Sequence, residues 1–285
     1  MKRSEFRFFD ALRVRWAEVD MQKIVFNGHY LMYVDTAIAG YWRAMAMPYA
    51  ETMAALGGDL YVRKATLEYL GSAQYDDVLD VGIRCARIGN SSMNFVAAVF
   101  RGEAALVSAE LVYVYADPAS QTSRPVPARL REVLQGFEDG ETMFEVTVGS
   151  WAALGEAAHP VRKAVFIDEQ KIPAELEWDS ADNIALHAVA RNRFGLALGA
   201  GRMVLLQPGV AKIGRMAVLR SARGSGIGRA LLEALASNAR EGGCHELVLH
   251  AQRSVEAFYT RAGFAPRGAG FEEAGIPHIE MVRVP

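Results

Sequence analysis

The apolar and polar positions in the first half of the chain predict a strand, one long helix and then four strands. The run from Leu12 to Trp16 alternates apolar residues with arginines, which is typical of a half-buried strand. From His29 to about Met45, apolar residues fall on most faces of a helix, as in a helix buried in a core. Turn residues separate four further expected strands: Tyr61–Leu70, Val78–Ile88, Met93–Arg101 and Ala104–Ala116. The economical arrangement is an antiparallel sheet wrapped round the helix.

The second half alternates strands and helices, which predicts a mixed α/β sheet. We expect strands at 144–149, 184–191, 196–205, 212–219, 246–251 and 278–284, and helices across 159–178, after 226 and at 254–262. Between the halves, a Pro- and Ser-rich stretch at 117–127 breaks the pattern, and a short helix is expected at 129–137. A linker near residue 140 therefore predicts an α+β protein with two domains, residues 1–140 and 141–285.

Composition argues against a nucleic-acid-binding, membrane, metal-binding or disulfide-rich protein. A length of 285 residues suits two domains, and 51% hydrophobic with 22% charged residues is typical of a globular chain. A formal charge of −2 gives no support for a nucleic-acid or membrane partner. Cys85 and Cys244 form no metal-ligand spacing and no disulfide framework, which favours no metal and a reducing, cytoplasmic compartment. No apolar segment follows the first residues, so we expect no export signal.

One glycine-rich turn carries chemistry. The apolar stretch Met216–Leu219 leads to Arg223-Gly224-Ser225-Gly226-Ile227-Gly228, and a helical pattern follows directly. Glycines here let backbone N–H groups surround an anion, and the helix N-terminus adds partial positive charge. The glycine spacing does not match a dinucleotide fold, and no Gly-Lys-Ser/Thr is present. The turn therefore indicates a diphosphate site, with a plain strand-to-helix turn as the alternative.

The same turn resembles the Arg/Gln-x-x-Gly-x-Gly/Ala segment of the GCN5-related N-acetyltransferases (the GNAT family), with Arg223, Gly226 and Gly228 in its defining positions. Phe258–Phe264 is similar to the Phe-Tyr-x-x-x-Gly-Phe segment of that family, and Arg162–Glu177 resembles its ElaA-like subgroup. The resemblance implies that coenzyme A is bound as a substrate, as acetyl-CoA. The resemblance assigns the binding of coenzyme A to the backbone of Met216, Ala217 and Val218 and to the glycine-rich turn, including Ile227 and Arg229. It also places Gln252 beside the pantetheine arm.

The resemblance also implies roles in acetyl transfer to an amine that the sequence does not identify. Tyr259 is expected to protonate the leaving sulfur, with a packed core tyrosine as the alternative. Glu169 is a candidate general base, and His187 is the other candidate. The alternative for Glu169 is a solvated charge on a helix face, and the alternative for His187 is a packed core histidine. Trp178 either walls the acceptor groove or only packs.

Residues 8–135 resemble the hotdog-fold acyl-CoA thioesterases of the 4-hydroxybenzoyl-CoA type, through segments at 15–30, 73–79 and 89–92. The resemblance implies that Asp20 is the catalytic carboxylate and that the backbone N–H groups of Asn27 and Gly28 polarise the thioester oxygen. A turn or N-cap aspartate is the alternative for Asp20. Glu18 is expected to be solvated, and Lys23 stands where many relatives have Gly. Hotdog sites usually form between subunits, so a homodimer or homotetramer is expected.

The leading interpretation is a bifunctional coenzyme-A-thioester enzyme, with an acyl-CoA thioesterase before residue 140 and an N-acetyltransferase after it. The alternative is that the hotdog domain only binds acyl-CoA or assembles the oligomer, while the transferase alone is active.

Overall fold

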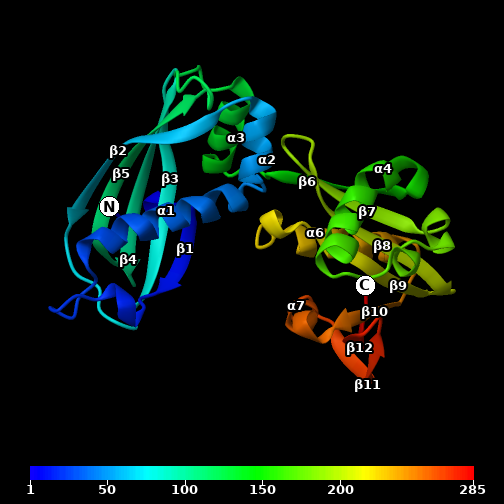
Figure 1. The fold of residues 1–285 in the computed structure, drawn as a ribbon. Helices are drawn as coiled ribbons and strands as arrows, with labels where there is room; N and C mark the ends of the chain where they lie inside the picture. The colour runs from blue at the N-terminus through cyan, green and yellow to red at the C-terminus, as the bar shows by residue number, and fades with distance from the viewer. The chain divides into compact units, whose positions relative to one another are not determined.

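The computed structural model describes residues 1–285, and the chain divides into two compact units. The first spans Met1–Met143 and the second Phe144–Pro285, coloured from blue to green and from green to red in Figure 1. The sequence predicts a linker near residue 140, and the contacts divide the chain between Met143 and Phe144. Each unit has its own sheet and its own hydrophobic core.

The N-terminal unit is an antiparallel sheet with a long helix against it, as predicted (Figure 1). The five strands lie in the order β1-β3-β4-β5-β2. Their bounds are β1 Phe8–Arg13, β2 Asp59–Tyr69, β3 Val78–Ile88, β4 Ser92–Arg101 and β5 Ala104–Ala116. The helices are α1 Asn27–Ala44, α2 Tyr49–Leu56 and α3 Ala128–Glu138, with short 3-10 turns η1 Arg3–Glu5 and η2 Trp16–Glu18. The bounds of β3 and β5 match the expected strands.

Helix α1 is the centre of this unit. Tyr41 is fully buried on it and meets the rings of Phe95 and Phe137 edge to face, at centroid distances of 5.8 and 5.1 Å. Such edge contacts contribute about 0.5–1.5 kcal/mol beyond the burial of area. Glu138, at the end of α3, accepts hydrogen bonds from the Tyr41 hydroxyl and from the Cys85 amide. Helix α1 is therefore a core helix, as its apolar pattern in the sequence predicts.

Two expectations for this unit are wrong. The first strand ends at Arg13, and Trp16 opens the turn η2 with a side chain that is 76% exposed. The Arg15 amide donates to Glu18 Oε2 (2.7 Å), and this local bond closes the turn instead of continuing the strand. Glu18 itself is buried at 3% exposure, although the sequence analysis expects it to be solvated. Helix α2, which follows Pro48, has no counterpart among the expected elements.

The C-terminal unit is a seven-stranded sheet in the order β11-β12-β10-β9-β8-β7-β6. The strands are β6 Phe144–Ser150, β7 Leu186–Asn192, β8 Ala197–Gln207, β9 Val210–Val218, β10 Glu246–Gln252, β11 Ala265–Glu273 and β12 Ile276–Arg283. The helices are α4 Trp151–Arg162, α5 Ala174–Glu177, α6 Ile227–Glu241 and α7 Glu256–Arg261. A π-helical segment, η3 Lys163–Glu169, continues α4, and 3-10 turns lie at η4 Ser180–Asn183, η5 Arg220–Ala222 and η6 Arg253–Val255.

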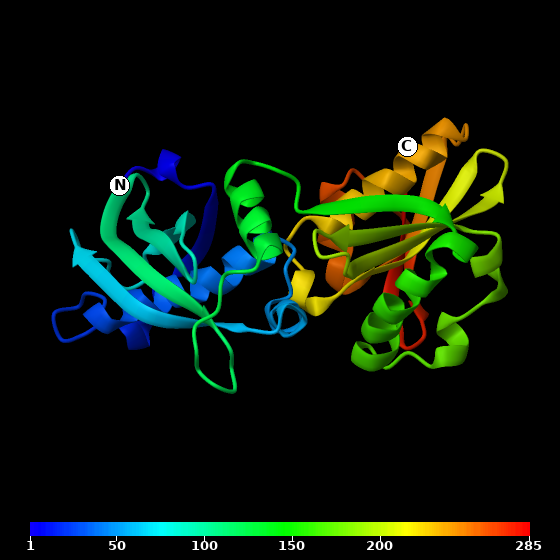
Figure 2. The same ribbon diagram turned by 90° about the horizontal axis from the view of Figure 1, so that it is seen from above.

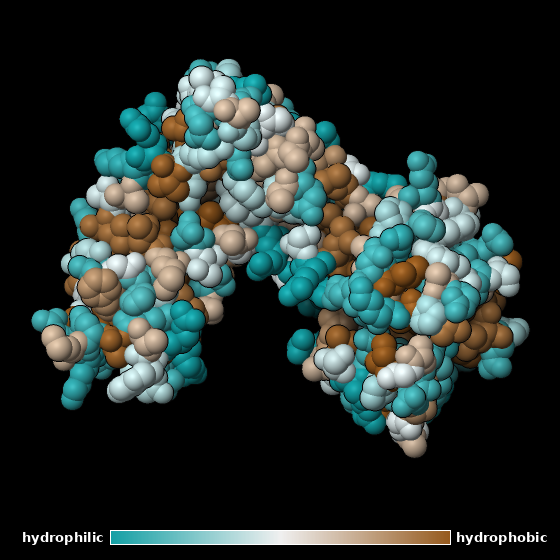
Figure 3. Space-filling model, viewed as in Figure 1, coloured by the Kyte–Doolittle hydropathy of each residue, from teal (hydrophilic) through white to brown (hydrophobic).

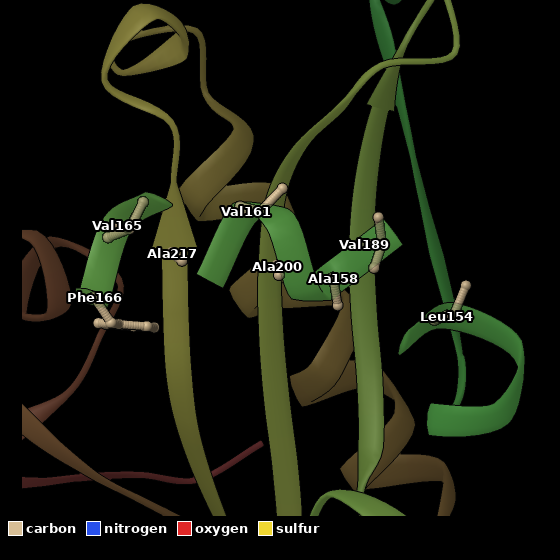
Figure 4. Close-up of a cluster of buried hydrophobic side chains, with 8 residues drawn as sticks. All are labelled: Leu154, Ala158, Val161, Val165, Phe166, Val189, Ala200 and Ala217. Carbon is tan, nitrogen blue, oxygen red and sulfur yellow. The ribbon is translucent and has the colours of Figure 1, made fainter. Parts of the chain in front are cut away.

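Helices α4 and α6 cover opposite faces of this sheet (Figure 2). Ala200 of β8 and Ala217 of β9 face α4 in a cluster of buried apolar side chains, which Figure 4 shows with Leu154, Ala158 and Val161 from the helix. The neighbouring Gly199 faces α6, because a Cβ there would lie 2.6 Å from the side chain of Ile227. Burial of both faces explains the nearly continuous apolar runs of these strands.

Strands β9 and β10 are the only parallel pair in the sheet, and they separate part of the way along. Their ladder runs from Val210↔Glu246 to Ile213↔Leu249 and stops there. Beyond Ile213, β9 pairs only with β8, and beyond Leu249, β10 pairs only with β12. The edge of β9 that faces β10 is therefore left without ladder partners over its last residues.

Two elements of this unit differ from the sequence analysis. The first helix begins at Trp151, earlier than the expected start near 159. Strand β11 was not expected, because all of its residues are exposed and it shows no alternation of buried and exposed positions. The remaining expected strands and helices are present, so the expected mixed α/β fold is confirmed.

Candidate functional sites

A cavity of about 830 Å³ opens where β9 and β10 separate. Its lining includes six residues that the sequence analysis assigns to the site: Glu169, Met216, Val218, Arg223, Gln252 and Tyr259. Ala217 points the other way, into the core against α4, so only its backbone is available to the cavity. The structure thus brings together residues from η3, β9, β10 and α7 that lie up to 90 positions apart in the sequence.

The glycine-rich turn presents free backbone donors beside this cavity. Gly224 and Gly226 have φ of 91° and 89°, a region that costs a residue with a Cβ about 1–2 kcal/mol. The amides from Gly224 to Arg229, except that of Ser225, donate no hydrogen bond within the protein. Ile227 is buried and opens α6, whose N-cap Gly226 makes no side-chain cap. Five unpaired amides at a helix N-terminus form a favourable environment for an anion.

Arg223 is held by a carboxylate from the other wall of the cavity. Its guanidinium donates to both oxygens of Glu169, at 2.8 and 2.7 Å, and its Nε donates to the Val218 carbonyl. The hydrogen bonds and charge of Arg223 lower the pKa of the Glu169 carboxyl. Glu169 therefore lies at the end of the cavity with the glycine-rich turn, and its carboxylate is occupied by an arginine. This placement is unfavourable for the general base that the sequence analysis expects at Glu169.

Tyr259 lines the cavity from α7 while most of its side chain is buried. Its ring packs on Phe258 and Phe264, at centroid distances of 4.9 and 6.1 Å. Burial alone, without a hydrogen-bond partner in the protein, raises the pKa of Tyr259 to about 12. A phenol in this environment stays protonated at neutral pH and is available as a proton donor.

A buried network of ion pairs fixes the backbone of β9 at the cavity. Arg215 has a φ of 52° and forms part of a bulge, since two residues of β9 stand opposite Gly201 of β8. Its side chain bonds Glu177 Oε2 (3.0 Å) and Asp179 Oδ2 (3.1 Å). Arg162, which is 1% exposed, holds Glu177 from the other side at 2.6 Å. Burial raises the pKa of Glu177 despite these two arginines.

Two further candidates lie outside the cavity lining. His187 is fully buried, and its Nε2 is 2.9 Å from the Asp182 carbonyl oxygen. Burial lowers the pKa of His187, which favours a neutral core histidine, and His187 does not line the cavity as a base there would. Trp178 stacks on His159 at 4.2 Å and lies under Arg162, so it packs instead of walling the groove.

The opposite end of the cavity contains residues that the sequence analysis missed. Lys212 of β9, His250 of β10 and Glu273 of β11 line it and contact one another. His250 precedes Gln252 by two positions, so strand alternation places both on one face. That spacing is the signal through which His250 could be found from the sequence. Glu273 has no such signal, since β11 itself was not expected.

In the N-terminal unit, Asp20 lies in a tight turn next to the start of α1. The bridge Val19↔Val25 closes this turn, and the Asp20 carboxylate accepts a hydrogen bond from the Gln22 amide (2.7 Å). Lys23 in the same turn has a φ of 63°. That value favours glycine, which gives a physical reason for the Gly of many relatives at this position.

Glu18 anchors this turn to α1. Its carboxylate accepts hydrogen bonds from the Arg15 amide and from the Tyr33 hydroxyl, both at 2.7 Å. Burial alone would raise the pKa of Glu18, but these bonds and the Arg15 charge lower it. Glu18 is therefore a buried, ionised anchor. Its stabilising effect is present at neutral pH and is lost as the pH falls through the lowered pKa.

The first turn of α1 presents two free donors. The amides of Asn27 and Gly28 donate no hydrogen bond within the protein, and the N-cap Phe26 provides no side-chain cap. Both residues are exposed. The Phe26 amide donates to the Glu18 carbonyl (2.9 Å), which holds the Asp20 turn beside these donors. A carboxylate next to a helix N-terminus with free amides is an arrangement suited to acyl chemistry at an oxyanion.

Comparison with known proteins assigns each unit to a different family model. Residues 156–284 match the model of the acetyltransferase (GNAT) domain, and residues 22–108 match that of the thioesterase superfamily. None of the helices combines the length and apolar character needed to cross a membrane.

Individual relatives each match part of the chain. A Bacillus subtilis protein named "Uncharacterized N-acetyltransferase YjcF" is 36% identical over 124 residues, which are 43% of this chain and 87% of that protein. An Aquifex aeolicus protein named "Putative esterase" is 27% identical over 127 residues, 45% of this chain and 94% of that protein. The solved structure of an acyl-CoA N-acyltransferase from Pseudomonas aeruginosa is 32% identical with a TM-score of 0.45, covering 50% of this chain and 99% of that one.

Proposed function

Because the chain belongs to the GNAT acetyltransferases through its C-terminal unit and to the thioesterase superfamily through its N-terminal unit, we propose that it is a bifunctional coenzyme-A-thioester enzyme. The C-terminal unit transfers acetyl from acetyl-CoA to an amine. The N-terminal unit hydrolyses an acyl-CoA. The single observation that carries this proposal is the set of five unpaired amides between Gly224 and Arg229, beside the cavity at the separated strands.

In the transferase site, the diphosphate of coenzyme A accepts hydrogen bonds from these amides, and Arg223 leaves Glu169 to pair with a phosphate. The pantetheine arm lies along the unpaired edge of β9 and beside Gln252. The backbone after the Arg215 bulge, from Met216 to Val218, polarises the acetyl carbonyl. Tyr259 then donates its proton to the departing sulfur.

In the thioesterase site, the amides of Asn27 and Gly28 bind the thioester oxygen at the N-terminus of α1. The Asp20 carboxylate attacks the carbonyl carbon or activates the water that does so. One observation favours a second candidate function for this unit. The Asp20 carboxylate already closes a turn with Gln22, as a purely structural aspartate would. In that case the unit only binds acyl-CoA or assembles the oligomer.

Release of free thiol tests both activities on the full-length protein. We expect thiol release from at least one member of a panel of short, long and aromatic acyl-CoAs without added amine. We also expect extra thiol release from acetyl-CoA, with formation of an amide, when primary amines are added. Absence of both activities contradicts the proposal. The two cysteines are unpaired thiols, which supports a reducing, cytoplasmic compartment for these reactions.

We further propose that the protein is a homodimer or homotetramer assembled through the N-terminal unit. Strand β2 is 11 residues long, lies at the edge of its sheet and pairs only with β5. Val62 and Tyr69 on it are 51% and 52% exposed, and Figure 3 shows apolar residues at the surface over the strands of this unit. A long strand edge with unpaired N–H and C=O groups is a template for pairing with another chain.

Sedimentation measurements test this assembly. Val62→Glu, at the edge of β2, is expected to shift the protein toward the monomer, because it places a carboxylate in the interface. Val284→Glu is the control, since Val284 is 76% exposed and lies in the other unit. A wild-type protein that is monomeric at all concentrations contradicts the proposed assembly.

A further inference from the structure

The end of the cavity opposite the glycine-rich turn contains a connected group of three titratable side chains. Nδ1 of His250 is 3.0 Å from Glu273 Oε2 and 3.2 Å from the amino group of Lys212. His250 is partly exposed and lines the same cavity as Met216 and Tyr259. The acetyl-transfer site proposed above therefore continues, without leaving the cavity, to a histidine with a carboxylate partner.

The position of His250 follows from the topology. The β9–β10 ladder ends at Ile213↔Leu249, so His250 is the first residue of β10 after the strands separate. The acetyl group lies near the Arg215 bulge in the proposed function, two residues beyond the same point on β9. An acceptor amine that approaches the acetyl group from the end away from the glycine-rich turn therefore passes His250.

The two carboxylates of the cavity outside this group are bound to arginines. Glu169 is bound through both oxygens to Arg223 at the opposite end. The Glu177 carboxylate is bound by Arg162 and Arg215. Each of these carboxylates would have to leave an arginine before it accepted a proton.

The imidazole of His250 has one nitrogen available. When Nδ1–H donates to Glu273, the lone pair is on Nε2, and Nε2 makes no hydrogen bond. The nearest acid to it is Glu280 of β12, at 3.9 Å, whose other oxygen accepts from Arg267. Lys212 faces the ring from β9, with its amino group 3.2 Å from Nδ1. Burial lowers the pKa of Lys212, which favours the uncharged amine beside the ring.

From this geometry we propose that His250, positioned by Glu273, is the general base that takes the proton from the acceptor amine. The inference rests on the acetyl-transfer function proposed for this unit. The amine nitrogen forms a bond to the carbonyl carbon, and its proton passes to His250 Nε2. The C–S bond then breaks, and the sulfur takes the proton of Tyr259. Solvent removes the proton from His250 and returns one to Tyr259, so amine and thioester become amide and thiol.

The test is the pH dependence of acetyl transfer by the full-length protein, with acetyl-CoA and four amines: spermidine, tryptamine, lysine and glucosamine. His250→Gln is expected to lower kcat about 10²-fold for the amine used best and to remove the acid limb of the profile, with the KM for acetyl-CoA unchanged. Glu273→Gln is expected to move the acid limb to lower pH, because the lost carboxylate had favoured the protonated ring. His245→Gln is the control, since His245 is exposed immediately before β10 and does not line the cavity.

Two results separate this inference from the function on which it rests. If the wild type acetylates none of the four amines, the acetyl-transfer proposal fails and this inference fails with it. If the wild type is active and His250→Gln keeps its rate and its acid limb, only the assignment of His250 is overturned. His278 is the other histidine in the cavity lining. If His278→Gln lowers kcat and removes the acid limb while His250→Gln does neither, the assignment of His250 is overturned as well.

Discussion

Replacing Asp20 by Asn is expected to lower acyl-CoA hydrolysis by the full-length protein about 10³-fold, because the amide is neither a nucleophile nor a base. Asparagine has nearly the same shape, and its oxygen can still accept the hydrogen bond from the Gln22 amide that closes the turn. The fold and the thermal midpoint are therefore expected to stay close to those of the wild type. The measurement is thiol release from the best substrate of the acyl-CoA panel.

Glu103→Gln is the matched control, since it removes a carboxylate that is 90% exposed in the turn between β4 and β5. It is expected to leave hydrolysis unchanged. Hydrolysis that survives Asp20→Asn at the wild-type rate removes Asp20 from the mechanism. If the wild type hydrolyses no member of the panel but has an acyl-CoA binding event that Gly226→Val leaves unchanged, the N-terminal unit is a binding module.

Replacing Tyr259 by Phe is expected to lower acetyl transfer about 10³-fold while the affinity for coenzyme A changes little. The substitution removes only the hydroxyl, which has no partner in the protein, and keeps the ring between Phe258 and Phe264. The pKa of Tyr259 is about 12, so the phenol stays protonated throughout the range in which the protein can be assayed. The ratio of wild-type to variant rates is therefore expected to be constant from about pH 6 to about pH 10.

Two measurements check this assignment: initial rates across that pH range, and calorimetric titration with coenzyme A. Tyr75→Phe is the control, because Tyr75 is exposed in the N-terminal unit. Equal rates for wild type and Tyr259→Phe at every pH contradict the role of the phenol as the acid. A variant that no longer binds coenzyme A assigns Tyr259 to binding instead.

The sequence predicts the elements that have a marked apolar pattern. In β3, Leu79, Val81 and Ile83 at alternate positions are fully buried and turn residues flank the strand, and its bounds match the expected strand. Strand β11 is exposed at every position, so no periodicity marks it. Helix α1 was expected because it is apolar on most faces, which is the pattern of a helix at the centre of a core.

The residues of the candidate sites fall into two groups: those that a local motif marks in the sequence, and those that only the fold brings together. Local motifs identify the glycine-rich turn and Tyr259, because the chemistry there depends on neighbouring residues in the sequence. The burial of Glu18 depends on Tyr33, 15 residues later, and the pairing of His250 with Glu273 depends on β11. Such contacts are created by the fold, so residue type and spacing alone do not reveal them. The ion pair of Arg223 with Glu169, 54 positions apart, is another example.

Calorimetric titration of the full-length protein with coenzyme A, comparing Gly226→Val with Gly243→Val, tests the central claim most directly. Both glycines have positive φ, 89° and 78°, and both have open space around the position of a Cβ, but they lie at opposite ends of α6. The backbone strain is therefore matched, and only Gly226 is in the turn that is proposed to hold the diphosphate. We predict that Gly226→Val weakens the C-terminal binding event about 10²-fold and that Gly243→Val leaves it unchanged. Equal affinity in both variants and the wild type would contradict the account.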